Sequence, residues 1–350
     1  MIGLKQAAAA ALSAVFGLSP ASASPQVSVY RQWRIVYHVD LKVTNYWWSG
    51  ALVAPSRDQA WAVGFTERSG GTRGYFLEHW NGVRWRMSAV PGVNLRPDAV
   101  AASGPDNVWL FSNANRAFVW DGQRWAAAQG TRGMSMSDAV VLGPSDVWTV
   151  ASRVCGTGAL DHWTGTGWST VTFPEGITAI SGSSPRNFWV LTRAETSTTY
   201  CRPVSGAPLH AYRWNGSSFQ QVQIPRIVVG HSVGPGPFAV SSPRDIWFAD
   251  WSQSTIWHWN GYRWARISVK APGVYVTPAP VVPDGRGGAW IGGCWHWLRG
   301  VWHPIDYSRD GCQETFGLAR IPGTTSAWRL GLYTFSRHEE GTIEVNGLLP

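Results

Sequence analysis

The sequence has few charged residues, and after its first twenty residues it has no long hydrophobic run. Asp, Glu, Lys and Arg make up 14% of the 350 residues, whereas Gly occurs 39 times and Pro 22 times. This composition argues against long solvent-exposed helices and favours a chain with many turns. The net charge is +8, almost all of the positive charge comes from Arg, and no run of basic residues occurs. We therefore expect no nucleic-acid partner.

Residues 1–23 have the pattern of a signal peptide. Lys5 precedes an apolar run over 7–18, and the small residues Ala21-Ser22-Ala23 follow it. The run is too short to span a bilayer, no second run of this kind occurs, and no Cys follows Ala23 to carry a lipid. We expect a secreted, extracellular protein without a membrane span, in which residues 24–350 form one domain.

Trp occurs 24 times, several times the usual frequency, and most copies belong to two alternating motifs. The first motif has Pro and polar residues, often Asp or Asn, followed by a small or apolar residue and Trp. Its copies are 56–61, 104–109, 143–148, 184–189 and 242–247, with looser copies at Trp290 and Trp328. The second motif is Trp, a turn such as Asn-Gly or Asp-Gly, and another aromatic residue, in copies that begin at Trp80, Trp120, Trp163, Trp214, Trp259 and Trp297.

Each pair of motifs predicts four antiparallel strands. Asn-Gly and Asp-Gly between apolar runs are strong hairpin signals, and the Pro-Asp segments form a second kind of turn. Seven units of about 47 residues fit the size of propeller blades. The last unit ends near 344–347 without a fourth strand, and residues 32–36 match the fourth strand at 84–87. We therefore predict an all-β, seven-bladed propeller, closed by the N-terminal strand pairing in the last blade.

The repeated Trp and His residues have a structural interpretation. We expect 19 of the Trp side chains to fill the wedges between blades. His79, His162, His258 and His296 occur once per blade, at the same place relative to the third-strand Trp, so they cannot converge on one metal ion. We expect neither a metal nor a cofactor.

These motifs resemble exported bacterial propeller repeats in which Ser-Pro-x-Asp-Val-Trp is followed by His-Trp-Asn/Asp-Gly-x-x-Trp. They form a loose set near the kelch or galactose-oxidase-type propellers and some Trp-rich lectin propellers, and the resemblance spans roughly 33–347. It implies the fold but no particular activity, because such propellers include lectins, enzymes and adhesion proteins. The paired glycines of kelch blades and the repeated sialidase box are missing, and no catalytic residue is carried over.

Length variation falls on one face of the predicted ring. The connections between second and third strands, and between blades, emerge there, and the long ones are 66–74, 152–158, 192–208, 225–237 and 307–314. Variable loops commonly carry the function of repeat proteins. The four cysteines lie on this face, and we predict the disulfides Cys155–Cys201 and Cys294–Cys312, which would hold a binding surface rigid or protect the protein outside the cell.

Five Trp residues depart from the repeat: Trp47, Trp48, Trp251, Trp257 and Trp295. We predict that Trp47, Trp48 and Trp251 lie on the variable face, where exposed rings suit the flat C–H surface of a sugar. The alternative is that they pack within the loops.

Three acidic residues also depart from the repeat. Asp98 and Asp138 begin the inner strands of adjacent blades, and Asp250 ends a second strand before Trp251. They are candidates to bind sugar hydroxyls or a hard cation, or to act as acid and base. The alternative is that Asp98 and Asp138 pair with an arginine such as Arg96 or Arg132.

The sequence favours a binding module for a polysaccharide or cell-wall glycan, which we expect to be monomeric. A polysaccharide hydrolase or lyase is the first alternative, with Asp98, Asp138 and Asp250 as the acids to test. A platform for an extracellular protein partner is the second. No nucleophile motif, phosphate loop or metal-ligand spacing supports an enzyme.

Overall fold

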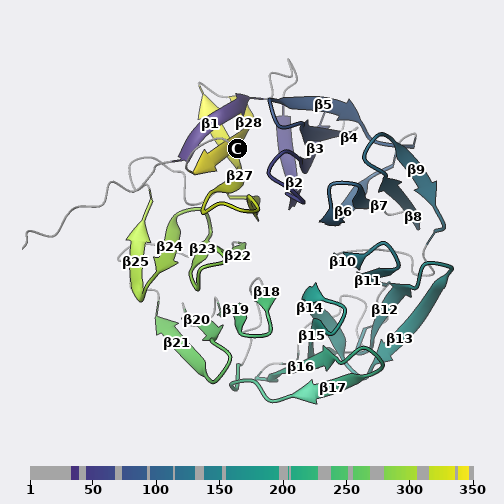
Figure 1. Cartoon of the computed structure of the whole chain (residues 1–350), viewed down its shortest axis with the longest axis vertical. Helices are drawn as coiled ribbons and strands as arrows, with labels where there is room; N and C mark the ends of the chain where they lie inside the picture. The colour runs from purple at the N-terminus through teal and green to yellow at the C-terminus, as the bar shows by residue number, and fades with distance from the viewer. Residues whose placement is uncertain are drawn as a thin grey trace, which may run out of the picture. The chain divides into compact units, whose positions relative to one another are not determined.

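Seven four-stranded antiparallel sheets surround a common axis in the unit formed by Arg31–Pro350 (Figure 1). The computed structural model describes residues 33–38, 45–67, 73–92, 95–112, 115–130, 138–151, 155–196, 204, 206–227, 238–250, 255–268, 280–305, 315–335 and 338–346. None of these residues belongs to a helix that is long and apolar enough to cross a membrane. The predicted signal peptide lies outside the described residues.

In six of the seven blades the strands follow the chain from the axis outward (Figure 1). The first three blades are β2 (Asn45–Val53), β3 (Ala60–Glu67), β4 (Arg73–Trp80) and β5 (Trp85–Ala89); β6 (Pro97–Gly104), β7 (Asn107–Ser112), β8 (Arg116–Trp120) and β9 (Trp125–Ala128); and β10 (Ala139–Gly143), β11 (Asp146–Val150), β12 (Gly158–Trp163) and β13 (Trp168–Phe173). The next three are β14 (Gly176–Ser184), β15 (Asn187–Arg193), β16 (Leu209–Trp214) and β17 (Phe219–Val222); β18 (Phe238–Ser242), β19 (Asp245–Asp250), β20 (Thr255–Trp259) and β21 (Trp264–Ser268); and β22 (Val281–Pro283), β23 (Ala289–Ile291), β24 (Trp295–Leu298) and β25 (Val301–Pro304).

The seventh blade joins the two ends of the chain. It consists of β26 (Gly317–Arg320), β27 (Ala327–Phe335), β28 (His338–Asn346) and, as its outer strand, β1 (Trp33–His38). Trp33 pairs with Asn346 and Arg34 with Val345. The predicted seven blades and their closure by the N-terminal strand are thus confirmed.

The closing strand also contacts both neighbouring blades. The Trp33 indole N–H donates to the carbonyl of Gly293 in blade 6, and its ring lies 5.9 Å from that of Trp290. On the other side, the Tyr37 hydroxyl donates to Glu78 of blade 1 over 3.4 Å. The Glu78 side chain is fully buried, and burial raises its pKa to about 8 despite the hydrogen bond from Tyr37.

Indole rings fill the wedges between blades, as predicted. All seven second-strand Trp side chains are at most 5% exposed. The Trp61 ring of blade 1 meets the rings of Trp120 and Trp125 of blade 2 at centroid distances of 5.0 and 5.1 Å. The Trp148 ring of blade 3 likewise contacts Trp214 and Phe219 of blade 4. Edge-to-face contacts of this kind add to the area that each ring buries.

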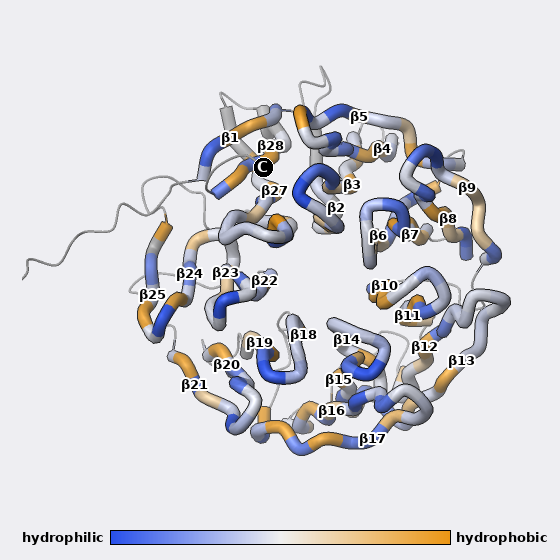
Figure 2. The backbone as a smooth tube through the Cα atoms, in the orientation of Figure 1, coloured by the Kyte–Doolittle hydropathy of each residue, from blue (hydrophilic) through white to orange (hydrophobic). Residues whose placement is uncertain are grey.

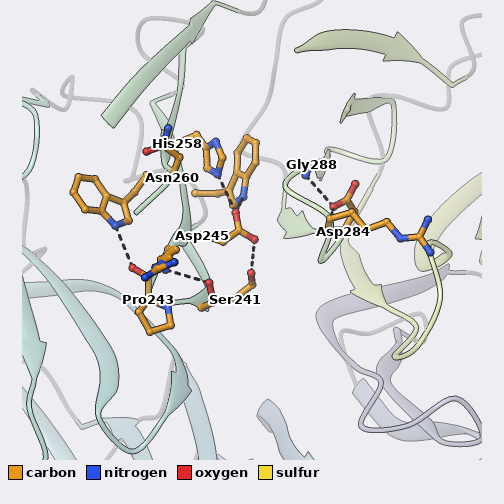
Figure 3. A network of polar contacts seen from close by, with 12 residues as sticks. Ser241, Pro243, Asp245, His258, Asn260, Asp284 and Gly288 are labelled. Carbon is orange, nitrogen blue, oxygen red and sulfur yellow. Dashed lines mark hydrogen bonds and ion pairs between the residues drawn. The ribbon is translucent and has the colours of Figure 1, made fainter. Parts of the chain in front are cut away.

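The repeated His residues belong to the same packing. In blade 5 the His258 ring stacks on Trp247 at 3.8 Å, and its Nε2 lies 2.9 Å from Oδ1 of Asp245 (Figure 3). The Trp247 indole N–H donates to the same oxygen over 2.7 Å. Blade 3 repeats these contacts with Trp148, His162 and Asp146. Each of these His side chains therefore stacks and forms its hydrogen bond within its own blade.

Other blades satisfy the buried indole differently. In blade 2 the Trp109 indole donates to Asn107, whose amide donates to Ser103, and no His is present. Blade 4 uses Trp189, Asn187 and Ser183 in the same way. Blade 1 is an exception, because neither the Trp61 indole N–H nor Nε2 of His79 has a hydrogen-bond partner among the described residues. His79 stacks on Trp61, and burial lowers the pKa of His79 to about 4.

The ring has two unlike ends. Because the strands are antiparallel and consecutive, the turns between first and second strands and between third and fourth strands emerge at one end, which we call the turn face. The connections between second and third strands and between blades emerge at the other, the variable-loop face. Most of the long connections on the variable-loop face lie outside the described residues.

Candidate functional site

Three consecutive blades place a carboxylate where the inner strand begins at the variable-loop face. Asp98 lies near the start of β6 in blade 2, Asp138 directly precedes β10 in blade 3, and Glu175 directly precedes β14 in blade 4. The inner strands of these blades are neighbours around the axis. The carboxylates therefore form an arc on the rim of the variable-loop face.

Asp98 pairs with Arg96, as the alternative from the sequence proposed. The Arg96 Nε lies 2.8 Å from Oδ1, and the Asp98 side chain is 12% exposed. Its Oδ2 is buried and has no hydrogen-bond partner among the described residues. Burial raises the pKa of Asp98, and the guanidinium opposes the shift. Asp98 therefore has one neutralised oxygen and one unused acceptor.

Asp138 is held by backbone amides of two blades. Its Oδ1 accepts the amide of Ala139 at 2.9 Å, and its Oδ2 accepts the amide of Ile180, in the next blade, at 3.5 Å. Burial raises the pKa of Asp138 to about 6, although both amides favour the charged form. Arg132, the suggested partner, lies outside the described residues. Asp138 thus links two inner strands and titrates near neutral pH.

The structure adds a cluster that the sequence analysis missed. Oε2 of Glu175 lies 2.8 Å from Nδ1 of His210 and accepts the Thr192 hydroxyl over 2.8 Å. The His210 side chain is 36% exposed and that of Glu175 19%. Because a carboxylate only accepts, Nδ1 carries the proton, which leaves Nε2 of a neutral His210 as an acceptor.

A signal for this cluster was present in the sequence. The repeated His residues directly precede a third-strand Trp, whereas His210 stands four positions before Trp214. Glu175 precedes an inner strand, like Asp138. Both residues thus depart from the repeat, as Asp98 and Asp138 do.

The remaining predicted residues do not assemble with this arc in the described structure. Trp48 is 3% exposed, packs between blades 1 and 7, and donates its indole N–H to the carbonyl of Gly331 over 3.0 Å. Its ring is therefore not available to a sugar, and the packing alternative holds. Trp47 and Asp250 lie in β2 and β19, but their side chains, like all of Trp251, are outside the described residues.

Neither Cys155 nor Cys294 has a free thiol. Cys201 and Cys312 lie outside the described residues, so the predicted pairing stays a prediction. Within the described part of the chain, no group of three or more His, Cys, Asp or Glu side chains is arranged to hold a metal ion.

The arc offers acceptors more than catalytic groups. The Glu175–His210 pair is its most exposed part, and Nε2 of His210 can accept a hydrogen bond from a hydroxyl group. A neutral, partly exposed imidazole oriented by a carboxylate is also a competent general base. No serine or cysteine hydrogen-bonds to His210 among the described contacts.

No protein-family model and no curated protein sequence matches the chain. Solved structures do match its fold. YCF48 bound to a D1 peptide superposes with a TM-score of 0.56 at 12% identity, covering 89% of this chain and 97% of that chain. Virginiamycin B lyase from Staphylococcus aureus, solved in a catalytically inactive form with quinupristin, gives 0.58 at 11% identity, covering 91% and 100%.

A third match is the GH74 xyloglucanase from Xanthomonas campestris. Its TM-score is 0.52 at 13% identity, and the match covers 81% of this chain and 50% of that chain. At these identities the likeness shows the propeller fold alone. A peptide binder, a lyase and a glycoside hydrolase share it.

Proposed function

We propose that the protein is a secreted binding module that recognises a carbohydrate at its variable-loop face. The observation that carries the proposal is the arc of Asp98, Asp138 and Glu175 on consecutive blades. Polar residues elsewhere in the repeat, such as Asp146 and Asp245, are occupied by buried indoles and imidazoles. The arc lies outside those contacts and keeps partly exposed acceptors.

Sugar hydroxyls are the donors that such acceptors fit. Nε2 of the partly exposed His210 can accept one hydroxyl, and the Glu175 carboxylate fixes the orientation of the imidazole. Trp47, Trp251 and Asp250 remain part of the proposal as contacts supplied by the surrounding loops. Trp48 does not, because it is buried.

A glycan array with the purified protein tests this function. We expect a restricted set of glycans to bind, and His210→Ala and Trp251→Ala each to weaken binding about tenfold or more, which corresponds to about 1.4 kcal/mol. Arg84→Ser, on the turn face, is the control and should bind like the wild type. No bound glycan, or equal binding by all variants, would contradict the proposal.

A hydrolase or lyase is a second candidate, favoured by the hydrogen-bonded Glu175–His210 pair. In this reading neutral His210 takes a proton at Nε2 while Glu175 stabilises the imidazolium. Turnover of a glycan that binds on the array, abolished by His210→Ala and reduced by Glu175→Gln, would favour the enzyme. Binding without turnover would favour the module.

A further inference from the structure

One position on the turn face differs in charge from blade to blade. It lies three residues before the second-strand Trp, and its side chain lies beside the glycine of the neighbouring turn, which has a positive φ in every case. The residues at this position in blades 1 to 5 are Asp58, Asp106, Ser145, Arg186 and Arg244. Because the glycine contact is kept while the side chain changes, this position tolerates either charge.

Arginines gather on the turn face of blades 4, 5 and 6. Arg263 and Arg299 lie in turns between third and fourth strands, and Arg286 lies in the turn before β23. They are exposed, as are Arg186 and Arg244. We call these five residues the basic turn surface. They lie far apart in the sequence, so the sequence has no run of basic residues that would predict this surface.

None of the five arginines of the basic turn surface forms an ion pair among the described residues. The acidic residues of these turns are Asp245 and Asp284, and each lies 2.9 Å from the imidazole of its own blade, His258 or His296. Blades 1 and 2 differ, because Asp58, Asp106 and Asp121 are exposed on their turns, and Asp121 lies 3.9 Å from Arg124. Exposed arginines thus outnumber exposed acids on the turns of blades 4 to 6, whereas the two kinds are balanced on the turns of blades 1 and 2.

The turns that carry these arginines are held by local hydrogen bonds. Oδ1 of Asn260 accepts the amides of Tyr262 and Arg263, both at 3.1 Å. The amide of Arg244 donates to the Ser242 hydroxyl, and the amide of Arg286 donates to Asp284. A rigid scaffold lowers the ordering cost when a partner binds.

The composition of the basic turn surface favours a partner that carries carboxylate groups and sugar rings. Arginine forms bidentate hydrogen bonds with carboxylates, and the chain's three lysines, Lys5, Lys42 and Lys270, lie outside the described residues. Tyr262 is 81% exposed beside Arg263 and offers a ring for a sugar face. Hydrophilic residues mark the turns around the ring (Figure 2), and isolated Tyr262 and Val301 do not form the apolar patch that a bilayer-inserting surface needs.

From these observations we infer that the turn face of blades 4 to 6 binds an anionic polysaccharide through its carboxylate groups. A polymer lying across three blades meets all five arginines at once, and several weak exposed pairs then add to a specific affinity. The site lies at the opposite end of the ring from the carboxylate arc. A result against the proposed function would therefore not contradict this second site, and the reverse also holds.

The test is the binding of polygalacturonate to the purified chain, with dextran as the neutral polymer. The test variant is Arg186→Ser, Arg244→Ser and Arg263→Ser combined. Ser145 occupies the position of Arg186 and Arg244 in blade 3, and Ser218 occupies the position of Arg263 in blade 4. We expect the test variant to lose about tenfold in affinity or more. The control variant combines Arg57→Ser, Arg84→Ser and Arg124→Ser on blades 1 and 2, and it should lose much less.

Three further measurements vary the NaCl concentration and replace the polymer with lipid vesicles or duplex DNA. Wild-type binding should weaken steeply between low and high NaCl and should be absent for dextran. Equal losses in the two variants, no binding to polygalacturonate, or tighter binding to phosphatidylglycerol vesicles or duplex DNA would overturn the inference. His210→Ala, which tests the variable-loop face, should leave polygalacturonate binding unchanged, so the two proposals fail separately.

Discussion

Replacing Asp245 tests whether the repeated Trp–His–Asp contacts hold the blades together. Its Oδ1 accepts the Trp247 indole N–H and lies 2.9 Å from Nε2 of His258, and the Ser241 hydroxyl donates to its other oxygen (Figure 3). The Trp247 side chain is fully buried. Asp245→Ala therefore leaves a buried indole donor without an acceptor and also removes two further contacts.

The expected cost of Asp245→Ala is about 3 kcal/mol of unfolding free energy. A buried donor left unsatisfied costs about 1–3 kcal/mol, and each further hydrogen bond adds about 1 kcal/mol. Asp245→Asn should cost less than about 1 kcal/mol, because Asn107 and Asn187 with their serines serve the same indole in blades 2 and 4.

Urea unfolding followed by Trp fluorescence measures both variants at one pH. An alanine variant within about 0.5 kcal/mol of the wild type would refute the reasoning. So would an asparagine variant as unstable as the alanine variant, because it would show that the charge rather than the acceptor matters.

Three further predictions concern the ring. Glu78 has a pKa raised from 4.5 to about 8 in the folded protein, so its contribution to stability should fall by about 1.4 kcal/mol per pH unit between these values; above pH 6.5, beyond the shifted ranges of Asp138 and His79, Glu78→Gln should abolish this slope in urea titrations up to pH 8, and a persisting slope would assign it elsewhere. Trp33→Ala should lower stability by about 3 kcal/mol by loosening the closing strand, and a melting temperature equal to the wild type would contradict its role. Gly261→Ala should destabilise the protein, because φ is +94° and the new Cβ would lie 2.7 Å from Arg244; Gly167→Ala, with open space around it, is the control in the same melting assay, and equal effects would refute the steric argument.

The ring could be predicted from sequence because its determinants are local and repeated. Each Asn-Gly or Asp-Gly turn fixes one hairpin, and each Trp marks one strand, so seven copies give seven sheets. Closure followed from the single unmatched strand at 32–36, which pairs with the last blade.

The candidate site was less predictable because its contacts join distant residues. Glu175 and His210 are 35 positions apart and meet only when adjacent connections converge on one face. Trp48 looked exposed because it broke the repeat, yet it fills the space between the first and last blades. A residue that departs from a repeat can serve the ring closure, which is itself unique, as well as a ligand.

The two faces differ in what the fold leaves free. On the turn face, Asp245 or Asn187 must accept an indole N–H, and Gly261 must keep its positive φ. The residue before this Asp or Asn lies beside the glycine, and it changes from Asp through Ser to Arg around the ring. Substitutions there alter surface charge at little cost to stability. Ligand binding can therefore change through these positions while the blades keep their stability. For this reason the sign of the charge at these positions indicates the kind of ligand.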